Sequence, residues 1–213
     1  MKKNNYCTIY LMRHGQSHGN HPIDTYGLDK ELTEKGHEQA RSAAQKLKNV
    51  KFDAIFASPL IRAQQTAKII AEEHKLAVLT KKALKERHHG VLEGHVVDDL
   101  KDELKKYYEM RVNLPYEKFK KVVIAEGRET DEAVMSRFIT TLREIAIAYT
   151  GKSVLVIGHV SIMKTFLVHL GIITYKDLSG KKFDNTGYIK LETDGIDFFV
   201  KELSGIDIEL KNE

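Results

Sequence analysis

The sequence predicts a three-layer α/β/α sandwich with a mixed, mostly parallel central sheet and a helical cap insertion. Short apolar segments of strand type alternate with segments of helical periodicity, a pattern typical of α/β folds. The last two predicted strands are separated only by the turn at residues 193–195, and so short a connection requires an antiparallel pair. Because one core can serve a chain of 213 residues, we expect a single domain over 1–213.

The first predicted strand ends at a histidine. Residues 6–12 form a short run of apolar and β-forming side chains that stops before Gly15, which places Arg13 and His14 at the C-terminal end of the strand. The helix that follows begins at Thr33, a residue type favoured at N-caps, and repeats alanine at helical spacing.

A second strand and helix follow in the same order. Residues 53–57 predict a short buried strand, and the Ser-Pro pair ending at Pro59 predicts a helix with Pro59 at its first position. That helix carries Arg62 and extends to about His74, and residues 78–80 predict another short strand.

The second half of the chain repeats this alternation after a less regular segment. Residues 95–128 are rich in lysine and lie between core elements, so we expect them to form a cap over the rim of the sheet. Ligands of such sheets bind beyond the carboxyl ends of the strands, which brings His14 and His159 to one rim. The remaining predicted elements are a helix at 130–149, a strand at 153–157, a helix at 160–170, and strands at 187–191 and 196–200.

Composition excludes several classes of protein. The single cysteine, Cys7, allows no intramolecular disulfide and favours a reducing compartment, so we expect a cytoplasmic protein. No segment approaches the roughly 20 apolar residues that span a bilayer. The net charge of +4 suits an acidic ligand, but interleaved lysines and acids indicate a mixed solvated surface rather than a nucleic-acid footprint. The oligomeric state stays open.

The most specific segment is 11–20, which contains Arg13-His14-Gly15 directly after the first strand. It resembles the histidine phosphatase superfamily, the phosphoglycerate-mutase-like proteins, whose signature is Arg-His-Gly in this place. Further blocks of that family follow in order and cover most of the chain outside the cap. They are Asp29 with Leu32-Thr33 and Gly36 to Ala40; Ala57 to Leu60 with Arg62-Ala63 and Gln65 to Ala67; Glu86 with Gly90 and Glu93-Gly94; His159; and Asn185-Thr186.

These residue types suit phosphoryl transfer. A transferred phosphoryl group spreads its charge over three oxygens, so the forked guanidinium donors of Arg13 and Arg62 match it. Neutral His14 can attack phosphorus to give a phosphohistidine, which divides one difficult displacement into two easier ones. Arg62 also falls in the first turn of its predicted helix, where the helix dipole favours an anion.

The resemblance implies roles for the remaining site residues. His159 is the second histidine of the pocket and donates to the phosphate oxygens, with Ser17 and Asn20 as smaller donors. Glu86 is the proton donor to the leaving group, a role open to a carboxylic acid above the pocket. Arg87 matches a substrate-contacting arginine of the mutase form of this loop. The implied activity needs neither cofactor nor metal, and its partner is a small phosphorylated substrate.

Two other functions share these residues. A cofactor-dependent phosphoglycerate mutase uses the same catalytic set but returns the phosphoryl group to a substrate; mutases of this family supply an Arg-Arg pair from the cap, and the chain contains no such pair. A non-catalytic phosphate-binding regulatory protein would be expected to have lost His14, Arg62 or Glu86.

Two features depart from the simplest interpretation. The family has glycine after the second histidine, whereas this chain has Val160, which affects the shape of the pocket more than its chemistry. A zinc site is a competing use of the histidines, but nearby arginines would repel a dication and no His-Glu-x-x-His pattern is present. Its candidate ligands are His18, His21, His88, His89 and His95 with Glu86 and Glu93.

Overall fold

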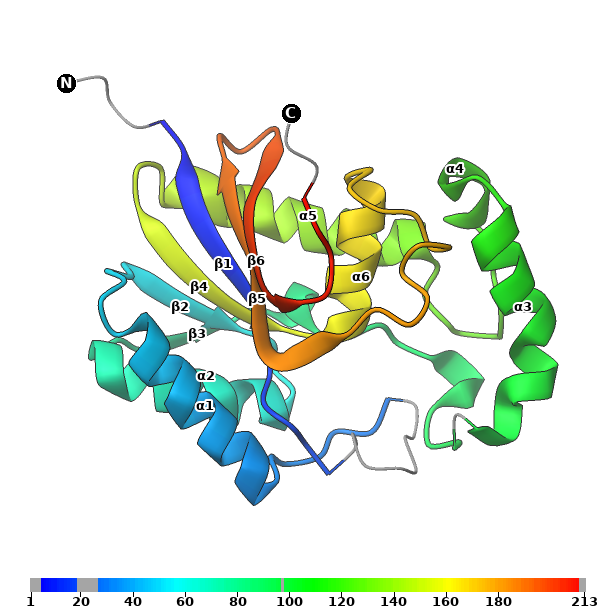
Figure 1. The fold of residues 1–213 in the computed structure, drawn as a ribbon, viewed down its shortest axis with the longest axis horizontal. Helices are drawn as coiled ribbons and strands as arrows, with labels where there is room; N and C mark the ends of the chain where they lie inside the picture. Colours follow the sequence, from blue (N-terminus) through cyan, green and yellow to red (C-terminus); the bar gives the residue numbers. More distant parts are fainter. Residues whose placement is uncertain (1–4, 19–26, 97, 211–213) are drawn as a thin grey trace.

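Six strands form one mixed sheet. They are β1 (Cys7–Arg13), β2 (Ala54–Ala57), β3 (Val78–Thr80), β4 (Ser153–Gly158), β5 (Phe183–Thr193) and β6 (Phe198–Ile206). The structure is a computed structural model that describes residues 5–18, 27–96 and 98–210. The strand order is β3-β2-β4-β1-β5-β6 (Figure 1). Strands β1 to β4 pair in parallel, β5 is antiparallel to β1, and β6 is antiparallel to β5. The predicted mixed, mostly parallel sheet is confirmed.

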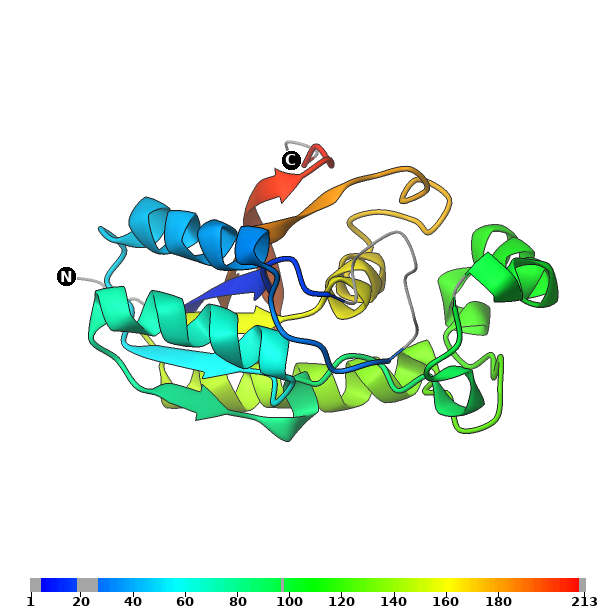
Figure 2. The same cartoon turned by 90° about the horizontal axis from the view of Figure 1, so that it is seen from below.

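Helices cover both faces of this sheet. One face carries α1 (Glu34–Leu47) and α2 (Ile61–His74), the other α5 (Asp131–Ala148) and α6 (Val160–His169); Figure 2 shows α1 and α5 on opposite sides of the strands. In β1, Ile9 and Leu11 join the core of α5 and α6, whereas Tyr10 and Met12 join the core of α1 and α2. Successive strand side chains point to opposite faces, so a strand covered on both sides is apolar throughout. The three-layer sandwich is confirmed.

Two predicted helix starts are confirmed and a third is wrong. The side-chain oxygens of Thr33 and Thr130 accept hydrogen bonds from backbone N–H groups three residues further on, at 3.0 and 3.2 Å. The helix predicted to begin at Pro59 begins at Ile61. Its first N–H donates over 2.9 Å to the carboxylate of Asp29, so a distant segment caps this helix and the local Ser-Pro pair does not set its start.

The segment 95–128 is helical and lies to one side of the sheet. It contains α3 (Lys101–Asn113) and α4 (Tyr116–Phe119), which lie beyond α6 in Figure 1. The ring centroids of Phe119 and Tyr175 are 5.5 Å apart, so α4 packs against the segment that leads into β5. Three short 3-10 helices precede α3, namely η1 (Lys82–Leu84), η2 (Gly90–Leu92) and η3 (Asp98–Leu100).

Strands β5 and β6 are longer than predicted. The pairing of β5 with β6 changes register between Phe183 and Tyr188, and this irregularity removes the alternating pattern that marks a strand in the sequence. For this reason the sequence placed the start of β5 at residue 187. The strand begins at Phe183 and reaches the rim where His14 lies. Within the described ranges, no helix has the length and apolar character needed to cross a membrane.

Candidate active site

Three separate elements hold the backbone of the loop that carries His14. The N–H of His14 donates to the carbonyl of Gly158, at the end of β4, over 3.1 Å. Nδ2 of Asn185 donates to the carbonyl of His14 over 3.0 Å, and the N–H of Gly15 donates to Oγ1 of Thr66 on α2 over 3.0 Å. Residues far apart in the sequence thus fix the position of His14. Thr66 on α2 therefore supports the loop through its side chain.

Glycines allow the first turn of α1 to pack against the same loop. A Cβ on Gly15 would lie 2.6 Å from the carbonyl oxygen of Gly36, and a Cβ on Gly36 would lie 2.0 Å from the carbonyl oxygen of Gln16. Both distances are far shorter than van der Waals contact, so only a residue without Cβ fits at either position. The loop and the helix therefore approach each other backbone to backbone.

Hydrogen bonds fix the tautomer of the His14 ring. Nδ1 lies 2.7 Å from the carbonyl oxygen of Gly15, and because a carbonyl can only accept, Nδ1 carries the proton. Nε2 accepts a hydrogen bond from the Nε–H of Arg62 over 3.1 Å, as an unprotonated ring nitrogen must. The lone pair available for chemistry is therefore on Nε2.

The surroundings of His14 keep its ring neutral. Burial lowers the pKa of His14 well below its usual value of 6.5, and the positive charges of Arg62 and Arg13 lower it further, against a smaller opposing effect of the Gly15 carbonyl. The side chain is 3% exposed. A neutral imidazole is the form that can act as a nucleophile, so the structure presents His14 in that form.

His159 lies beside His14, as predicted from their places at the strand ends. It is the N-cap residue of α6, and its ring centroid lies 5.2 Å from that of His14. Nε2 of His159 lies 2.7 Å from Oγ of Ser58, whereas its Nδ1 makes no hydrogen bond with any described residue. Burial, His14 and Arg62 lower the pKa of His159 well below 6.5. His159 is thus neutral here, although the family resemblance implies a protonated donor; a bound phosphate dianion would favour the protonated form.

The two predicted arginines flank this histidine pair. Arg62 is buried; besides its bond to His14, its Nη1 donates to the carbonyl of Leu28 over 3.0 Å and lies 3.6 Å from the carboxylate of Asp29. Arg13 Nη1 donates to the carbonyl of Phe183 over 2.5 Å. Both guanidiniums are therefore oriented by the protein itself, which lowers the conformational entropy lost when an anion binds.

The carboxylate of Glu86 lies against the first turn of α6, the helix that follows His159. Its Oε2 accepts a hydrogen bond from the N–H of Ser161 over 3.2 Å, and its Oε1 accepts one from its neighbour Arg87 N–H over 2.9 Å. The first turn of a helix is a favourable place for a carboxylate. Its negative charge acts on Arg62, whose pKa is lowered by burial and raised in part by Glu86 and Asp29. Glu86 is thus within electrostatic reach of the same pocket.

Arg87 takes part in a buried ion pair. Its Nη2 lies 2.5 Å from Oδ1 of Asp131 and 3.2 Å from Oγ1 of Thr165, and its Nη1 donates to the carbonyl of Glu129 over 2.8 Å. Tyr175 OH donates to the other carboxylate oxygen of Asp131 over 2.5 Å. The structure therefore joins Arg87 to the protein interior, and the Asp131 network is one that no sequence motif pointed to.

The remaining predicted residues differ in what the structure says of them. Ser17 is buried, and its backbone pairs with that of Leu32. Asn20 and His21 lie outside the described residues. Val160 begins α6 and lines a cleft next to Arg13. Among the residues that the structure describes, no group of three or more His, Cys, Asp or Glu side chains is arranged to hold a metal ion.

Lysines that the sequence analysis did not single out lie close to Arg13. A cleft of about 650 Å³ is lined by Arg13, Lys164 and Lys182 together with Asn185. Nζ of Lys164 lies 5.2 Å from the ring centroid of Phe183, the residue whose carbonyl binds Arg13. The signal that could have found Lys164 is its place five residues after His159, one turn and a half into a helix that begins at the rim.

A buried neutral histidine between arginines, at the carboxyl ends of an α/β sheet, is typical of enzymes that transfer phosphoryl groups through a covalent intermediate. Within that class the chain belongs to the histidine phosphatase superfamily (branch 1), whose sequence model matches residues 9–204. The family predicted from the Arg-His-Gly segment is confirmed.

Proteins similar to the chain include ones named as phosphatases and ones named as mutases or mutase-like proteins. It is 29% identical to phosphoserine phosphatase 1 of Hydrogenobacter thermophilus over 84% of this chain and 83% of that protein. It is 31% identical to phosphoglycerate mutase-like protein 4 of Arabidopsis thaliana over 75% of this chain and 69% of that protein. The crystal structure of a phosphoglycerate mutase from Bacillus anthracis superposes with a TM-score of 0.79 at 27% identity, covering 95% of this chain and 94% of that one.

Proposed function

We propose that this histidine phosphatase hydrolyses small phosphate monoesters through a phosphohistidine on His14. The observation that carries the proposal is the neutral His14 ring, whose Nε2 lone pair faces the Nε–H of Arg62 at 3.1 Å while the His159 ring lies 5.2 Å away between centroids. These groups occupy the rim at which α/β sheets bind their ligands. The likeness to a bacterial phosphoserine phosphatase supports the same reaction.

In the first step, Nε2 of His14 attacks phosphorus and the P–O bond to the leaving alcohol breaks. Arg62 exchanges its hydrogen bond with Nε2 for hydrogen bonds to the phosphoryl oxygens, and Arg13 and His159 donate to the same oxygens. Glu86, which takes up a proton when the phosphate dianion binds beside it, gives this proton to the leaving oxygen, so that a neutral alcohol departs. The products of this step are phosphohistidine and the alcohol.

In the second step, water attacks the phosphohistidine and the P–N bond to His14 breaks. The Glu86 carboxylate left by the first step takes a proton from that water, which restores the carboxylic acid and releases inorganic phosphate. The arginines need not move between the steps, because both displacements occur at the same phosphorus. Ser17 and Asn20 are proposed as further donors to the phosphate.

Arg87 differs from the other proposed residues because its side-chain donors bind groups of the protein interior. The sequence predicts contact with the substrate, and this stays a prediction. The donors of Arg87 that bind Asp131, Thr165 and the carbonyl of Glu129 support a role in fixing the backbone next to Glu86. A single domain over 1–213, a cap over 95–128 and a cytoplasmic location likewise stay predictions.

A phosphoglycerate mutase is the second candidate, favoured by the match to the Bacillus anthracis mutase over most of both chains. The two functions differ in whether the phosphohistidine meets water or a second substrate hydroxyl. Phosphate release and conversion of 3-phosphoglycerate to 2-phosphoglycerate, primed with bisphosphoglycerate, should be measured on one preparation. If isomerisation is faster than phosphate release, the protein is a mutase and the phosphatase proposal is wrong.

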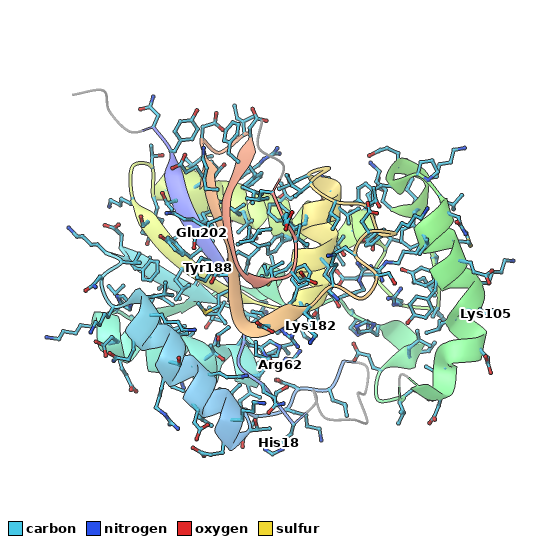
Figure 3. The ribbon with its side chains drawn as sticks, in the orientation of Figure 1. His18, Arg62, Lys105, Lys182, Tyr188 and Glu202 are labelled. Carbon is cyan, nitrogen blue, oxygen red and sulfur yellow. The ribbon has the colours of Figure 1, made fainter. Side chains whose placement is uncertain are left out.

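The decisive test of the nucleophile is His14→Ala with trapping of the labelled intermediate. We expect turnover to be lost and acid-labile phosphate to be found on His14 of the wild-type enzyme. The matched control is His18→Ala, four residues further on and exposed (Figure 3); it should leave turnover and resistance to chelators unchanged. Label on another residue type, or zinc-dependent activity that is lost with His18, would contradict the mechanism.

A further inference from the structure

The cleft beside the catalytic loop is strongly basic. It lies between α1, the first turns of α6 and the start of β5, and Asp184 is the one carboxylate among its described lining residues. Its cations are Arg13, Lys35, Lys46, Lys164 and Lys182. With respect to the described part of the chain, none of these four lysines forms an ion pair. The positive charge of these four lysines is therefore not balanced by ion pairs with the described residues.

This cleft adjoins the loop that carries His14. Arg13 belongs to both, and Asn185, which binds the carbonyl of His14 over 3.0 Å, lines the cleft as well. Phe183 lies between two cations: its carbonyl accepts from Arg13 at 2.5 Å, and its ring centroid is 5.2 Å from Nζ of Lys164. Lys164 and Arg13 thus lie on either side of Phe183, next to the loop that carries His14.

The charge of Lys164 is poorly compensated. Burial lowers the pKa of Lys164, and the guanidiniums of Arg111 and Arg13 lower it further. An ammonium group in such surroundings is stabilised when an anion binds to it. Lys182 is exposed at the start of β5 (Figure 3), so a charged ligand can meet it from solvent.

We propose that Arg13, Lys164 and Lys182 form a subsite for a second phosphate group of the substrate. The preferred substrates would then be small bisphosphorylated molecules, with one phosphate at His14 and the other in this cleft. Several ammonium groups around a guanidinium suit a phosphate dianion, which has two negative charges and several oxygens. They suit a carboxylate, with one charge and two oxygens, less well. This inference rests on the proposed phosphatase function and specifies its substrate class.

Three probes that share one carbon skeleton test the subsite. Glucose 6-phosphate has no second anion, 6-phosphogluconate adds a carboxylate, and glucose 1,6-bisphosphate adds a phosphate. We expect kcat/KM for the bisphosphate to exceed that for glucose 6-phosphate by about ten-fold or more, the effect of one charge-assisted hydrogen bond. The preference should fall as salt is raised, because screening weakens charge interactions.

Lysine variants test whether the cleft causes the preference for the bisphosphate. Lys164→Met and Lys182→Met should each lower the bisphosphate to monophosphate ratio of kcat/KM by about ten-fold, and Lys164→Arg should retain most of the ratio. The matched control is Lys105→Met, which removes a lysine on the outer side of α3, away from Lys182 (Figure 3), and should leave the ratio unchanged.

Each outcome decides the proposal. A preference for the bisphosphate that is lost in both lysine variants supports the subsite, whereas no preference, or one that both variants keep, overturns it. An equal preference for 6-phosphogluconate would overturn the assignment to a second phosphate. If no ester is hydrolysed, the proposed phosphatase function is wrong. The subsite can still be tested, because calorimetry measures binding without turnover. Glucose 1,6-bisphosphate should bind His14→Ala about ten-fold more tightly than His14→Ala/Lys164→Met; equal binding would remove the subsite.

Discussion

Nε of Arg62 donates a hydrogen bond to Nε2 of His14, the nitrogen proposed as nucleophile, over 3.1 Å. This bond holds the lone pair in place and keeps a proton away from it, because a cation next to an imidazole disfavours the protonated form. Arg62, which is proposed to bind the phosphate, therefore also keeps Nε2 of His14 unprotonated. Its two roles can be separated, because one depends on charge and the other on the forked shape of the guanidinium.

The first prediction is that Arg62→Met moves the acid limb of the pH profile to higher pH. Arg62 lowers the pKa of His14, so removing the charge raises that pKa, and the protonated, inactive ring persists to higher pH. Arg62→Lys keeps the charge and should leave the limb in place, while still losing rate because an ammonium cannot fork. The measurement is single-turnover phosphorylation across pH 4 to 8, and an upward shift in both variants, or in neither, would contradict the charge argument.

For Glu86→Gln we expect a loss that depends on the leaving group. Alkyl phosphates need a proton on departure and should lose roughly 10²- to 10⁴-fold in phosphorylation rate, the usual contribution of general acid catalysis. Nitrophenyl phosphate departs as a stable anion and should phosphorylate His14 at nearly the normal rate. Because glutamine keeps an oxygen that can accept from Ser161 N–H, the loop should stay in place. Equal losses with both substrates would remove Glu86 from the acid role.

Gly36→Ala separates packing from helix propensity. Propensity alone predicts a gain of about 1 kcal/mol, since alanine favours a helix over glycine. The structure predicts a loss of roughly 1–3 kcal/mol from overpacking, because the new Cβ would lie 2.0 Å from the carbonyl oxygen of Gln16. Urea denaturation gives the sign, with the exposed Glu38→Ala on the same helix as control. If Gly36→Ala is more stable than the wild type, the loop at Gln16 can move away from the new Cβ at little cost, and the packing argument is wrong.

We expect the effects of substituting Arg87 and Asp131 on the free energy of unfolding to be strongly coupled in a double-mutant cycle. The two side chains are 5% and 2% exposed, and removing one partner of such a pair leaves the other charge buried at a cost of about 3–5 kcal/mol. We expect Asp131→Asn to lower the free energy of unfolding by that order. Adding Arg87→Met to it should cost little more, or restore part of the loss. Additive losses, measured by urea denaturation, would mean that the two residues act independently.

Local patterns predicted the sheet and the layers for physical reasons, and most of the candidate site residues came from the family resemblance. β1 is buried on both faces, so its sequence is apolar throughout, and a helix cap such as Thr33 acts on a backbone N–H three residues away. His14 and His159 follow strands directly, and parallel strands end at one rim. Signals that act over a few residues can be read from the sequence without knowledge of the fold.

Interactions between distant segments could not be predicted in this way. Asp29 caps α2 from 32 positions away, so the start at Ile61 left no local mark. The Asp131 carboxylate binds Arg87, which lies 44 positions away, and neither residue belongs to a periodic pattern. Lys164 resembled any other lysine on a helix until the fold placed it beside Phe183. Charge that matters because of its neighbours can be recognised only once those neighbours are known.

The antiparallel direction of β5 has an evolutionary consequence. Because β5 runs against β1, its beginning rather than its end lies next to His14, so that Lys182, just before the strand, and Asn185, near its start, lie at the rim. The connection between α6 and β5 can therefore lengthen, shorten or change composition while the strand ends that carry His14 and His159 stay as they are. If Lys182 contacts the substrate as proposed, part of the substrate preference can change in this connection without any change at His14 or His159.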